Sequence, residues 1–161
     1  MCTAITSENI NISFFLFLSG ASSSSCQSLP CLYYGNGSAL KAIEINSSKV
    51  HTVLTNLNSV EALDVHVKLN LVYWTETRPN AIKRLNVTSG KVEGILRENL
   101  GVIDGLAVEW ESDLIYWTDK TYNRIEVAQL DGKNRRALIT SGTPRPLEIA
   151  VDPRKGYALQ M

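Results

Sequence analysis

The sequence has few residues of the kinds that hold metal ions or carry acid–base catalysis. Three cysteines and two histidines occur in 161 residues, and zinc needs four such ligands at close spacing. His51 has no potential partner nearby in the sequence. Around His66, apolar residues such as Leu63 and Val65 alternate with polar ones, so His66 is predicted to lie on the solvated face of a strand. No nucleophile lies beside a base, and no glycine-rich loop opens a helix pattern. The sequence therefore predicts a protein with no metal, no cofactor and no enzymatic activity.

Net charge and long apolar runs are absent as well. Sixteen basic and sixteen acidic side chains cancel, so the charge does not favour nucleic acid as a partner. Basic residues gather toward the C-terminus but acidic residues interrupt them, which is typical of a solvated rim rather than of a polyanion site. No apolar run reaches the roughly 18 residues that span a bilayer. Any membrane attachment is therefore predicted to come from segments outside this chain.

The N-terminal region differs in composition from the rest. Residues 12–21 form a short apolar run that ends in small residues, and a serine run follows. This pattern resembles the core and cleavage region of a secretory signal peptide. Residues 1–11 carry no lysine or arginine, so an apolar strand is the alternative. We assign residues 1–25 to a predicted signal peptide and linker.

The cysteines and the glycosylation sequons favour the same compartment. Removal of a signal peptide would take Cys2 away and leave Cys26 and Cys31, an even number close enough in sequence to form a small disulfide loop. Besides Asn11, three Asn-x-Ser/Thr sequons are candidates for glycosylation: Asn36, Asn46 and Asn86. These features predict an extracellular or cell-surface location.

A repeat is the main feature of the sequence. Two near-identical tetrapeptides occur 43 residues apart, Tyr73-Trp74-Thr75-Glu76 and Tyr116-Trp117-Thr118-Asp119. The same shift aligns 60–76 with 103–119 without a gap, and it aligns 106–109 with 149–152. A fixed period of this length indicates a repeat architecture in which each unit packs on the next.

Each repeat unit carries the pattern of four short strands. Residues 105–110 alternate in hydrophobicity, 114–117 form a continuous apolar run that predicts a strand buried on both faces, and 124–130 alternate again. Asp131-Gly132 predicts a hairpin turn, and the more polar 136–140 suit an outer edge strand. Four strands in about 43 residues are typical of a β-propeller blade. The predicted fold class is therefore all-β, a partial propeller of about two full blades and parts of two others.

The tetrapeptides are predicted to be structural. Tyrosine and tryptophan are large side chains that suit the space between stacked blades, with ligand contact as the less favoured alternative. The threonine and the acidic residue are expected to form hydrogen bonds with neighbouring backbone. The structural motif comprises Tyr73, Trp74, Thr75, Glu76, Tyr116, Trp117, Thr118 and Asp119.

The period, the YWTE and YWTD tetrapeptides and the following NRIEVAQLDG resemble the low-density lipoprotein receptor class B, or YWTD, repeat. In that family six repeats close a six-bladed propeller in extracellular receptors. The resemblance assigns 26–70 to a degenerate first blade and the start of the next, 71–113 and 114–156 to class B repeats, and 157–161 to a truncated end. It thus implies a fragment of a larger, single-pass receptor.

Among the branches of this family, the sequence most resembles the Wnt co-receptors. A propeller that follows directly on a predicted signal peptide is similar to the arrangement in that branch, whose propellers bind secreted proteins on one open face. The resemblance implies a secreted protein ligand, of Wnt type or an antagonist. The alternatives are an endocytic propeller of lipoprotein-receptor type and a nidogen-like matrix adhesion module.

Asp104 is the one ligand-binding residue that the resemblance transfers. It lies in the Asp-Gly-Leu-Ala motif that enters a blade, although it could equally be a structural acceptor in a turn. Asn58 and Ser59 stand where the family has an acidic pair, and Leu147 replaces an arginine that follows the proline. These departures leave the ligand open.

Overall fold

The repeated strand pattern builds antiparallel sheets from consecutive strands of the chain. The computed structural model describes residues 5–7, 10–13, 31–140, 145–152 and 157–160. The first sheet contains β1 (Ile5–Ser7), β2 (Ile10–Ser13), β3 (Cys31–Asn36), β4 (Ala39–Glu44) and β5 (Val50–Leu54). Most of the predicted signal region lies outside the described residues, so the signal peptide stays a prediction.

The next sheets follow the 43-residue period. The second sheet contains β6 (Val60–His66), β7 (Leu71–Glu76), β8 (Ala81–Asn86) and β9 (Val92–Leu96). The third contains β10 (Ile103–Glu109), β11 (Leu114–Asp119), β12 (Arg124–Gln129) and β13 (Arg136–Ile139). The last described pair is β14 (Ile149–Asp152) with β15 (Tyr157–Gln160). A 3-10 helix, Val67–Leu69, is the one helix among the described residues.

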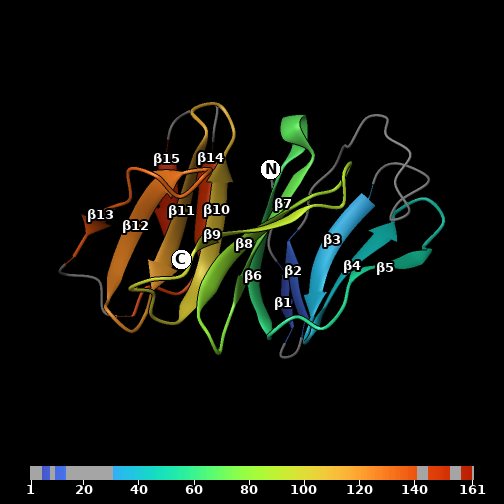
Figure 1. Ribbon diagram of the computed structural model, residues 1–161, viewed down its shortest axis with the longest axis horizontal. Coiled ribbons are helices and arrows are strands. Elements are labelled where there is room, and N and C mark those ends of the chain that lie inside the picture. Colours follow the sequence, from blue (N-terminus) through green and yellow to red (C-terminus); the bar gives the residue numbers. More distant parts are fainter. Residues whose placement is uncertain (1–4, 8–9, 14–30, 141–144, 153–156, 161) are drawn as a thin grey trace.

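The sheets stand side by side, each with a face against the next (Figure 1). The first strands of neighbouring sheets contact one another, β6 with β10 and β10 with β14. Sheets whose innermost strands meet in this way are arranged as the blades of a propeller. The predicted all-β, partial propeller is therefore confirmed.

The sheets do not begin where the sequence repeats begin. The segment 71–113 supplies the second, third and fourth strands of one sheet, β7 to β9, and then the first strand of the next sheet, β10. Each repeat therefore joins two blades covalently. Because of this offset, every sequence repeat contains residues from both sides of a contact between blades.

The core lies between the sheets, and the Tyr-Trp pair explains how one strand fills two such layers. Adjacent residues of a strand point to opposite faces. Tyr73 packs with Ile115 and Trp117 between the second and third sheets, whereas Trp74 packs with Leu40 between the first and second. Each tetrapeptide thus puts a tryptophan against the preceding blade and a tyrosine against the following one.

Burial on both faces is complete for β7 and partial for β11. Every residue of β7 is buried, but Leu114 and Tyr116 on β11 are half-buried. The third sheet covers β7 with four strands, whereas the described part of the sheet beyond β11 has two. The prediction of a strand buried on both faces therefore holds for β7 and only in part for β11.

The prediction that His66 is solvated is wrong. Its side chain is buried, its Nδ1 accepts a hydrogen bond from the Leu69 N–H at 3.2 Å, and its Nε2 lies 3.3 Å from Asp113 Oδ1. Alternation indicates a solvated face only where one face of the strand is free. As the innermost strand of its sheet, β6 has another blade on each side, so both of its faces are buried.

Candidate functional site

The turns between second and third strands lie at the same end of the molecule as the connections that enter each first strand. The Thr77 N–H donates to the Asn58 carbonyl at 3.2 Å, and the Lys120 N–H donates to the Val102 carbonyl at 3.0 Å. We call this end the turn end; its described segments are 55–59, 77–80, 97–102, 120–123 and 145–148. It is the lower edge in Figure 1, opposite the 3-10 helix.

Asp104, the residue transferred by resemblance, lies at the turn end. Its Oδ1 is 2.8 Å from Lys120 Nζ, and the two side chains are 23% and 40% exposed. Its carboxylate makes no hydrogen bond to a backbone N–H within the part of the chain that the structure describes. The pair is open to solvent, and a charged group of a ligand could exchange with either partner.

Two large apolar side chains are exposed on the adjoining segments, Tyr122 at 53% and Leu147 at 54%. The Arg124 guanidinium lies over the Tyr122 ring, 4.5 Å from its centroid. The Arg145 N–H donates to Asn123 Oδ1 at 3.3 Å, which places the segment of Leu147 beside the turn of Tyr122. Exposed aromatic and apolar side chains bordered by polar groups are common at protein-binding surfaces.

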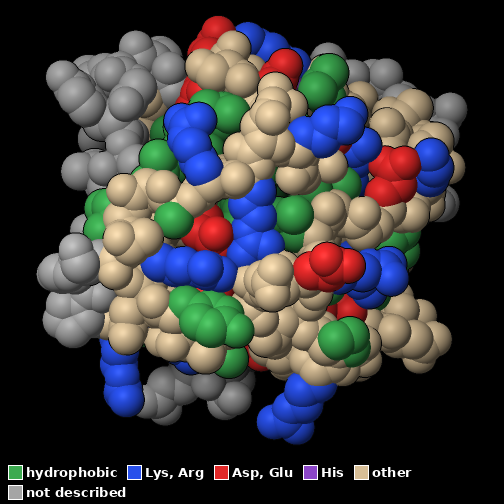
Figure 2. Space-filling model, turned by 60° about the vertical axis from the view of Figure 1, so that its left-hand side comes forward, with side chains coloured by type: hydrophobic (Ala, Val, Ile, Leu, Met, Phe, Trp, Pro, Cys, Tyr) green, Lys and Arg blue, Asp and Glu red, His purple; other side chains and the backbone are tan. Residues whose placement is uncertain are grey.

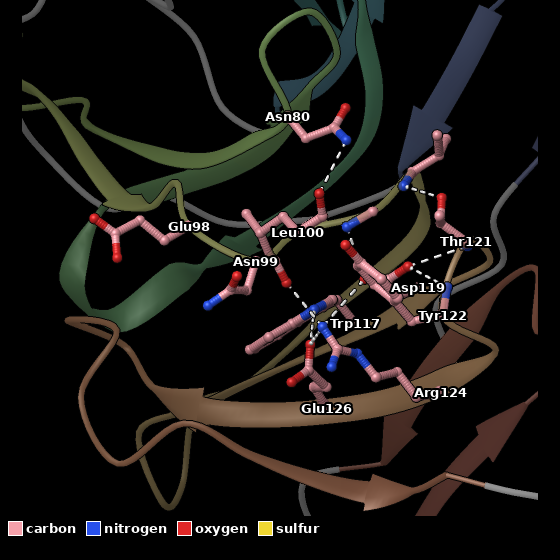
Figure 3. A network of polar contacts seen from close by, with 12 residues as sticks. Asn80, Glu98, Asn99, Leu100, Trp117, Asp119, Thr121, Tyr122, Arg124 and Glu126 are labelled. Atoms are coloured by element: carbon pink, nitrogen blue, oxygen red, sulfur yellow. Dashed lines mark hydrogen bonds and ion pairs between the residues drawn. The ribbon is translucent and has the colours of Figure 1, made fainter.

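Asp119 and Thr118 support this surface from beneath. The buried Asp119 accepts hydrogen bonds from the N–H of Gly101 at 2.8 Å and from those of Thr121 and Tyr122 at 3.1 Å each (Figure 3). Thr118 Oγ1 accepts from the Gly105 N–H at 2.9 Å and donates to the Leu147 carbonyl at 2.5 Å. These bonds hold the turn and the connection that faces it in one geometry.

The second sheet repeats this arrangement with a longer acid. Thr75 Oγ1 accepts from the Ala62 N–H at 2.9 Å, as Thr118 does from Gly105. Glu76 accepts from the Asn58 N–H at 3.2 Å and from Trp74 Nε1 at 2.8 Å, and it pairs with Lys83 at 2.9 Å. The tetrapeptide therefore anchors the turn end in both blades.

A second network, which sequence reasoning missed, fastens the connection 97–102 to the third sheet. Glu126 accepts from Trp117 Nε1 at 3.2 Å and from Arg135 at 2.8 and 3.1 Å. Arg135 also donates to the carbonyls of Glu98 and Asn99 at 2.6 and 2.7 Å. Arg124 reaches the Asn99 carbonyl from the same strand as Glu126, as Figure 3 shows. The available signal was Glu126, an acidic residue inside the apolar pattern of β12.

The basic residues do not form a continuous strip on the face shown in Figure 2. Lys and Arg side chains there are interspersed with acidic and apolar ones. Several of the basic residues are paired: Arg84 with Glu93 at 2.8 Å, and Lys133 with Asp131 at 2.7 Å. This distribution is that of a solvated rim.

Comparisons with known proteins identify the family. The family model of the low-density lipoprotein receptor repeat class B matches residues 113–153. Over 132 residues the chain is 37% identical to the low-density lipoprotein receptor-related protein 5 of Homo sapiens, a match that covers 80% of this chain. The chain belongs to the class B repeat family. It spans 8% of the length of that relative.

Solved structures agree with this assignment. The nidogen/laminin complex contains a chain that matches this class B repeat protein with a TM-score of 0.75 and 26% identity, covering 81% of this chain and 51% of the other. A gluconolactonase from Xanthomonas campestris matches with a TM-score of 0.68 at 15% identity, covering 81% of this chain and 52% of the other. At that identity the second likeness shows the fold alone.

The predicted modifications of this class B repeat chain fall at different places in the fold. Cys31 is buried and disulfide-bonded, whereas Cys26 lies outside the described residues. The sequon residues Asn36, at the end of β3, and Asn46, in a turn, are exposed. Asn86 is half-buried, and its Oδ1 accepts a hydrogen bond from the Ser89 N–H at 2.9 Å. Glycosylation stays a prediction, which exposure favours at Asn36 and Asn46.

Within the described ranges, no three His, Cys, Asp or Glu side chains gather closely enough to hold a metal ion. In the same part of the chain, no helix has the length and apolar character needed to cross a membrane.

Asp64 is a buried carboxyl group that links two blades of the propeller. It accepts hydrogen bonds from the N–H of Val65 and from that of Val108 on the next first strand, both at 2.6 Å. Burial raises the pKa of Asp64 to about 8, although the two hydrogen bonds act in the opposite direction. At neutral pH the folded chain therefore retains a proton that the unfolded chain has released.

This difference predicts that acid stabilises the fold between about pH 4 and pH 8. The unfolded state binds fewer protons there, so the free energy of unfolding falls as pH rises, by at most about 1.4 kcal/mol per pH unit. Asp64→Asn should flatten this slope, as measured by urea denaturation at pH 5 and pH 8. The control is Asp131→Asn, at a side chain that is 41% exposed and whose pKa the neighbouring Lys133 lowers below the tested range, which should keep the wild-type slope. Equal slopes for wild type and Asp64→Asn would contradict the prediction.

Proposed function

We propose that the chain is a ligand-binding part of an extracellular propeller in a receptor-related cell-surface protein of Wnt co-receptor type. Its partner on this proposal is a secreted protein, a Wnt-type ligand or an antagonist of one. The match to the receptor-related protein 5 supports the receptor class. The observation that carries ligand binding is the turn end, where the accessible Asp104–Lys120 pair and two exposed apolar side chains rest on buried hydrogen bonds.

A partly exposed charge pair suits recognition of a protein. Burial of the pair by a ligand would strengthen its electrostatic interactions, because the partner excludes water from around them. The turn end is also preorganised: Asp119 and Thr118 fix its backbone before any ligand arrives. A surface that is already ordered loses little conformational entropy on binding.

Removal of Asp104 tests this function. The chain would be displayed on mammalian cells through a membrane anchor, and binding of a soluble Wnt-type ligand and of a secreted antagonist would be titrated. Asp104→Ala should weaken binding by about tenfold, as loss of one partner of an interface charge pair does. Display level reports whether each variant folds.

A matched control lies at the opposite end of the molecule. Glu111 pairs with Lys68 at 2.9 Å, and these side chains are 52% and 63% exposed. Glu111→Ala should leave ligand binding unchanged. If Asp104→Ala bound the ligand as tightly as wild type, the turn end would not be the binding site. The same conclusion would follow if Glu111→Ala lost as much affinity as Asp104→Ala.

A second candidate function is a matrix adhesion module. The structural likeness to a chain of the nidogen/laminin complex favours it. The same displayed chain would be titrated with laminin. Binding of laminin without binding of either Wnt-type probe would replace the receptor function by this one.

A further inference from the structure

The turn between β12 and β13 carries a paired-basic motif, Lys133-Asn134-Arg135-Arg136. Proteases that cleave after paired basic residues have acidic substrate pockets, because a carboxylate forms charge-assisted hydrogen bonds with lysine and arginine. Such a protease binds its substrate in an extended conformation, and exposed turns are preferred places of cleavage. The question is therefore whether the fold leaves this motif accessible.

The segment on both sides of the Arg136–Ala137 bond is exposed. Lys133 and Asn134 precede the bond in the turn, and β13 and Thr140 follow it; all of these residues are exposed. β13 forms the outer edge of its sheet (Figure 1) and pairs with β12 alone. Separation of an edge strand whose side chains are exposed costs little free energy. The fold thus leaves this bond open to a protease.

A second paired-basic motif is protected by the fold. Lys83-Arg84 lies on β8, which pairs with β7 on one side and with β9 on the other. Both side chains are half-buried, and the flanking residues Ile82 and Leu85 are buried. Cleavage there requires the whole sheet to open. The remaining pair in the sequence, Arg154-Lys155, lies outside the described residues.

Arg135 is the half-buried member of the exposed motif. Its guanidinium donates to Glu126 Oε1 and Oε2 at 3.1 and 2.8 Å, and to the carbonyls of Glu98 and Asn99 at 2.6 and 2.7 Å. A protease that binds Arg135 in an acidic pocket must first break these hydrogen bonds. They therefore limit the rate at which the folded chain is cleaved, because only the locally opened state is a substrate.

We propose that the Arg136–Ala137 bond is a processing site for a serine protease specific for paired basic residues, and that the hydrogen bonds of Arg135 limit its cleavage. Water adds across the peptide bond, which leaves a carboxylate on Arg136 and an amino group on Ala137. This inference goes beyond the proposed function. It uses the extracellular location, where such a protease would meet the chain, and it does not use the turn end.

The two products should stay together in the folded protein. The pairs Ile125–Ile139 and Glu126–Ala137 of the β12–β13 ladder lie beyond the bond and need no covalent link between the strands. Ile149 packs with Ala107 and Ile125 in the core and holds the second product as well. The cleaved chain should therefore elute as one species from a gel-filtration column and give two bands after denaturation.

Kexin, a serine protease that cleaves after Lys-Arg and Arg-Arg, tests the site on the purified full chain. Peptides that span 80–89 and 131–140 should both be cleaved, which shows that both sequences are substrates. In the folded chain, cleavage after Arg136 should be at least about a hundredfold faster than cleavage after Arg84, since β8 is exposed only when its sheet opens. N-terminal sequencing tells the products apart, because they begin at Ala137 or at Leu85.

Variants of the chain test the residues. Arg136→Ala should slow cleavage at this bond by at least about a hundredfold, because the protease pocket is left without its charged partner. Glu126→Gln should speed it about tenfold, because a neutral amide holds Arg135 less strongly than a carboxylate does. Cleavage after Arg84 should stay at the wild-type rate in Glu126→Gln, which distinguishes release of Arg135 from unfolding. The control is Lys49→Ala, at an exposed lysine on another blade, which should change neither rate.

Secretion of the chain from mammalian cells tests whether a cellular protease uses the site. A product that begins at Ala137 should appear with the wild-type chain and be absent with Arg136→Ala. If the folded chain resisted kexin while the 131–140 peptide was cleaved, or if both motifs were cleaved at the same rate, the proposal would be wrong. An intact secreted chain would also overturn it, and an unchanged rate in Glu126→Gln would overturn the role of Arg135. Ligand binding at the turn end is tested separately by Asp104→Ala, so these outcomes leave the proposed function standing.

Discussion

Replacement of Trp117 by alanine should lower the free energy of unfolding by about 3–5 kcal/mol, as truncation of a large core aromatic does. The Trp117 side chain is fully buried between the second and third sheets. Its removal leaves a cavity. The Arg135 guanidinium, 5.4 Å from the centroid of the ring, loses its cation–π contact, and Glu126 loses one hydrogen-bond donor. Urea denaturation and the secreted yield of the variant would measure the loss.

The sequence offers a matched control for this prediction. Trp110 is half-buried, and its Nε1 donates to the exposed Glu111 at 3.2 Å. The same substitution there, Trp110→Ala, removes the same atoms from a site where water can fill the space. We expect it to cost less than half as much as Trp117→Ala. Equal costs would show that Trp117 does not hold the two blades together.

Asp119→Ala should destabilise the chain by about 1–3 kcal/mol or more, because a buried N–H left without an acceptor costs that amount and the Gly101 N–H is buried. Three N–H groups lose their acceptor, those of Gly101, Thr121 and Tyr122. The half-buried Arg124 also loses an acidic neighbour, which lies 3.6 Å away. Thermal and urea denaturation would measure this loss, and hydrogen exchange at the three amides would locate it.

Two further variants sharpen the test. Asp119→Asn keeps one acceptor oxygen but replaces the other by an NH2 group, which faces a backbone N–H and cannot accept from it. Its loss of stability should therefore lie between those of wild type and Asp119→Ala. Asp131→Ala removes an exposed aspartate that accepts from the Lys133 N–H at 3.0 Å, and surface changes of this kind cost about 0.5 kcal/mol or less. If Asp119→Ala were as mild as Asp131→Ala, the acid of the tetrapeptide would not support the turn end.

The strands and their order could be predicted because they depend on local chemistry. A strand shows its alternation in every few residues, and a turn such as Asp131-Gly132 depends on the backbone freedom of its own residues. Gly132 has φ +85°, in the region that favours glycine. The Tyr-Trp pair also follows from local alternation, since neighbouring residues of a strand must face opposite sides.

The buried polar groups could not be predicted in the same way. Asp64 and His66 occupy strand positions that look solvated in the sequence, yet their partners Val108 and Asp113 lie more than 40 residues away. In the sequence, Arg135 is one of several basic residues predicted to lie on the surface. It pairs with Glu126 because the hairpin of β12 and β13 brings the two side chains together. The sequence does not contain the distances that decide whether such groups are paired.

The sequence by itself determined the repeat, the all-β blades and the family of this protein, because each of these rests on patterns that extend over neighbouring residues or recur at a fixed period. Only the tertiary structure decided which side chains form the turn end. Asp104, Tyr122 and Leu147 come from three segments, and they meet because the blade after each turn packs on the blade before it. The same packing decided that His66 is buried, since the burial of a first strand depends on the neighbours that the fold supplies.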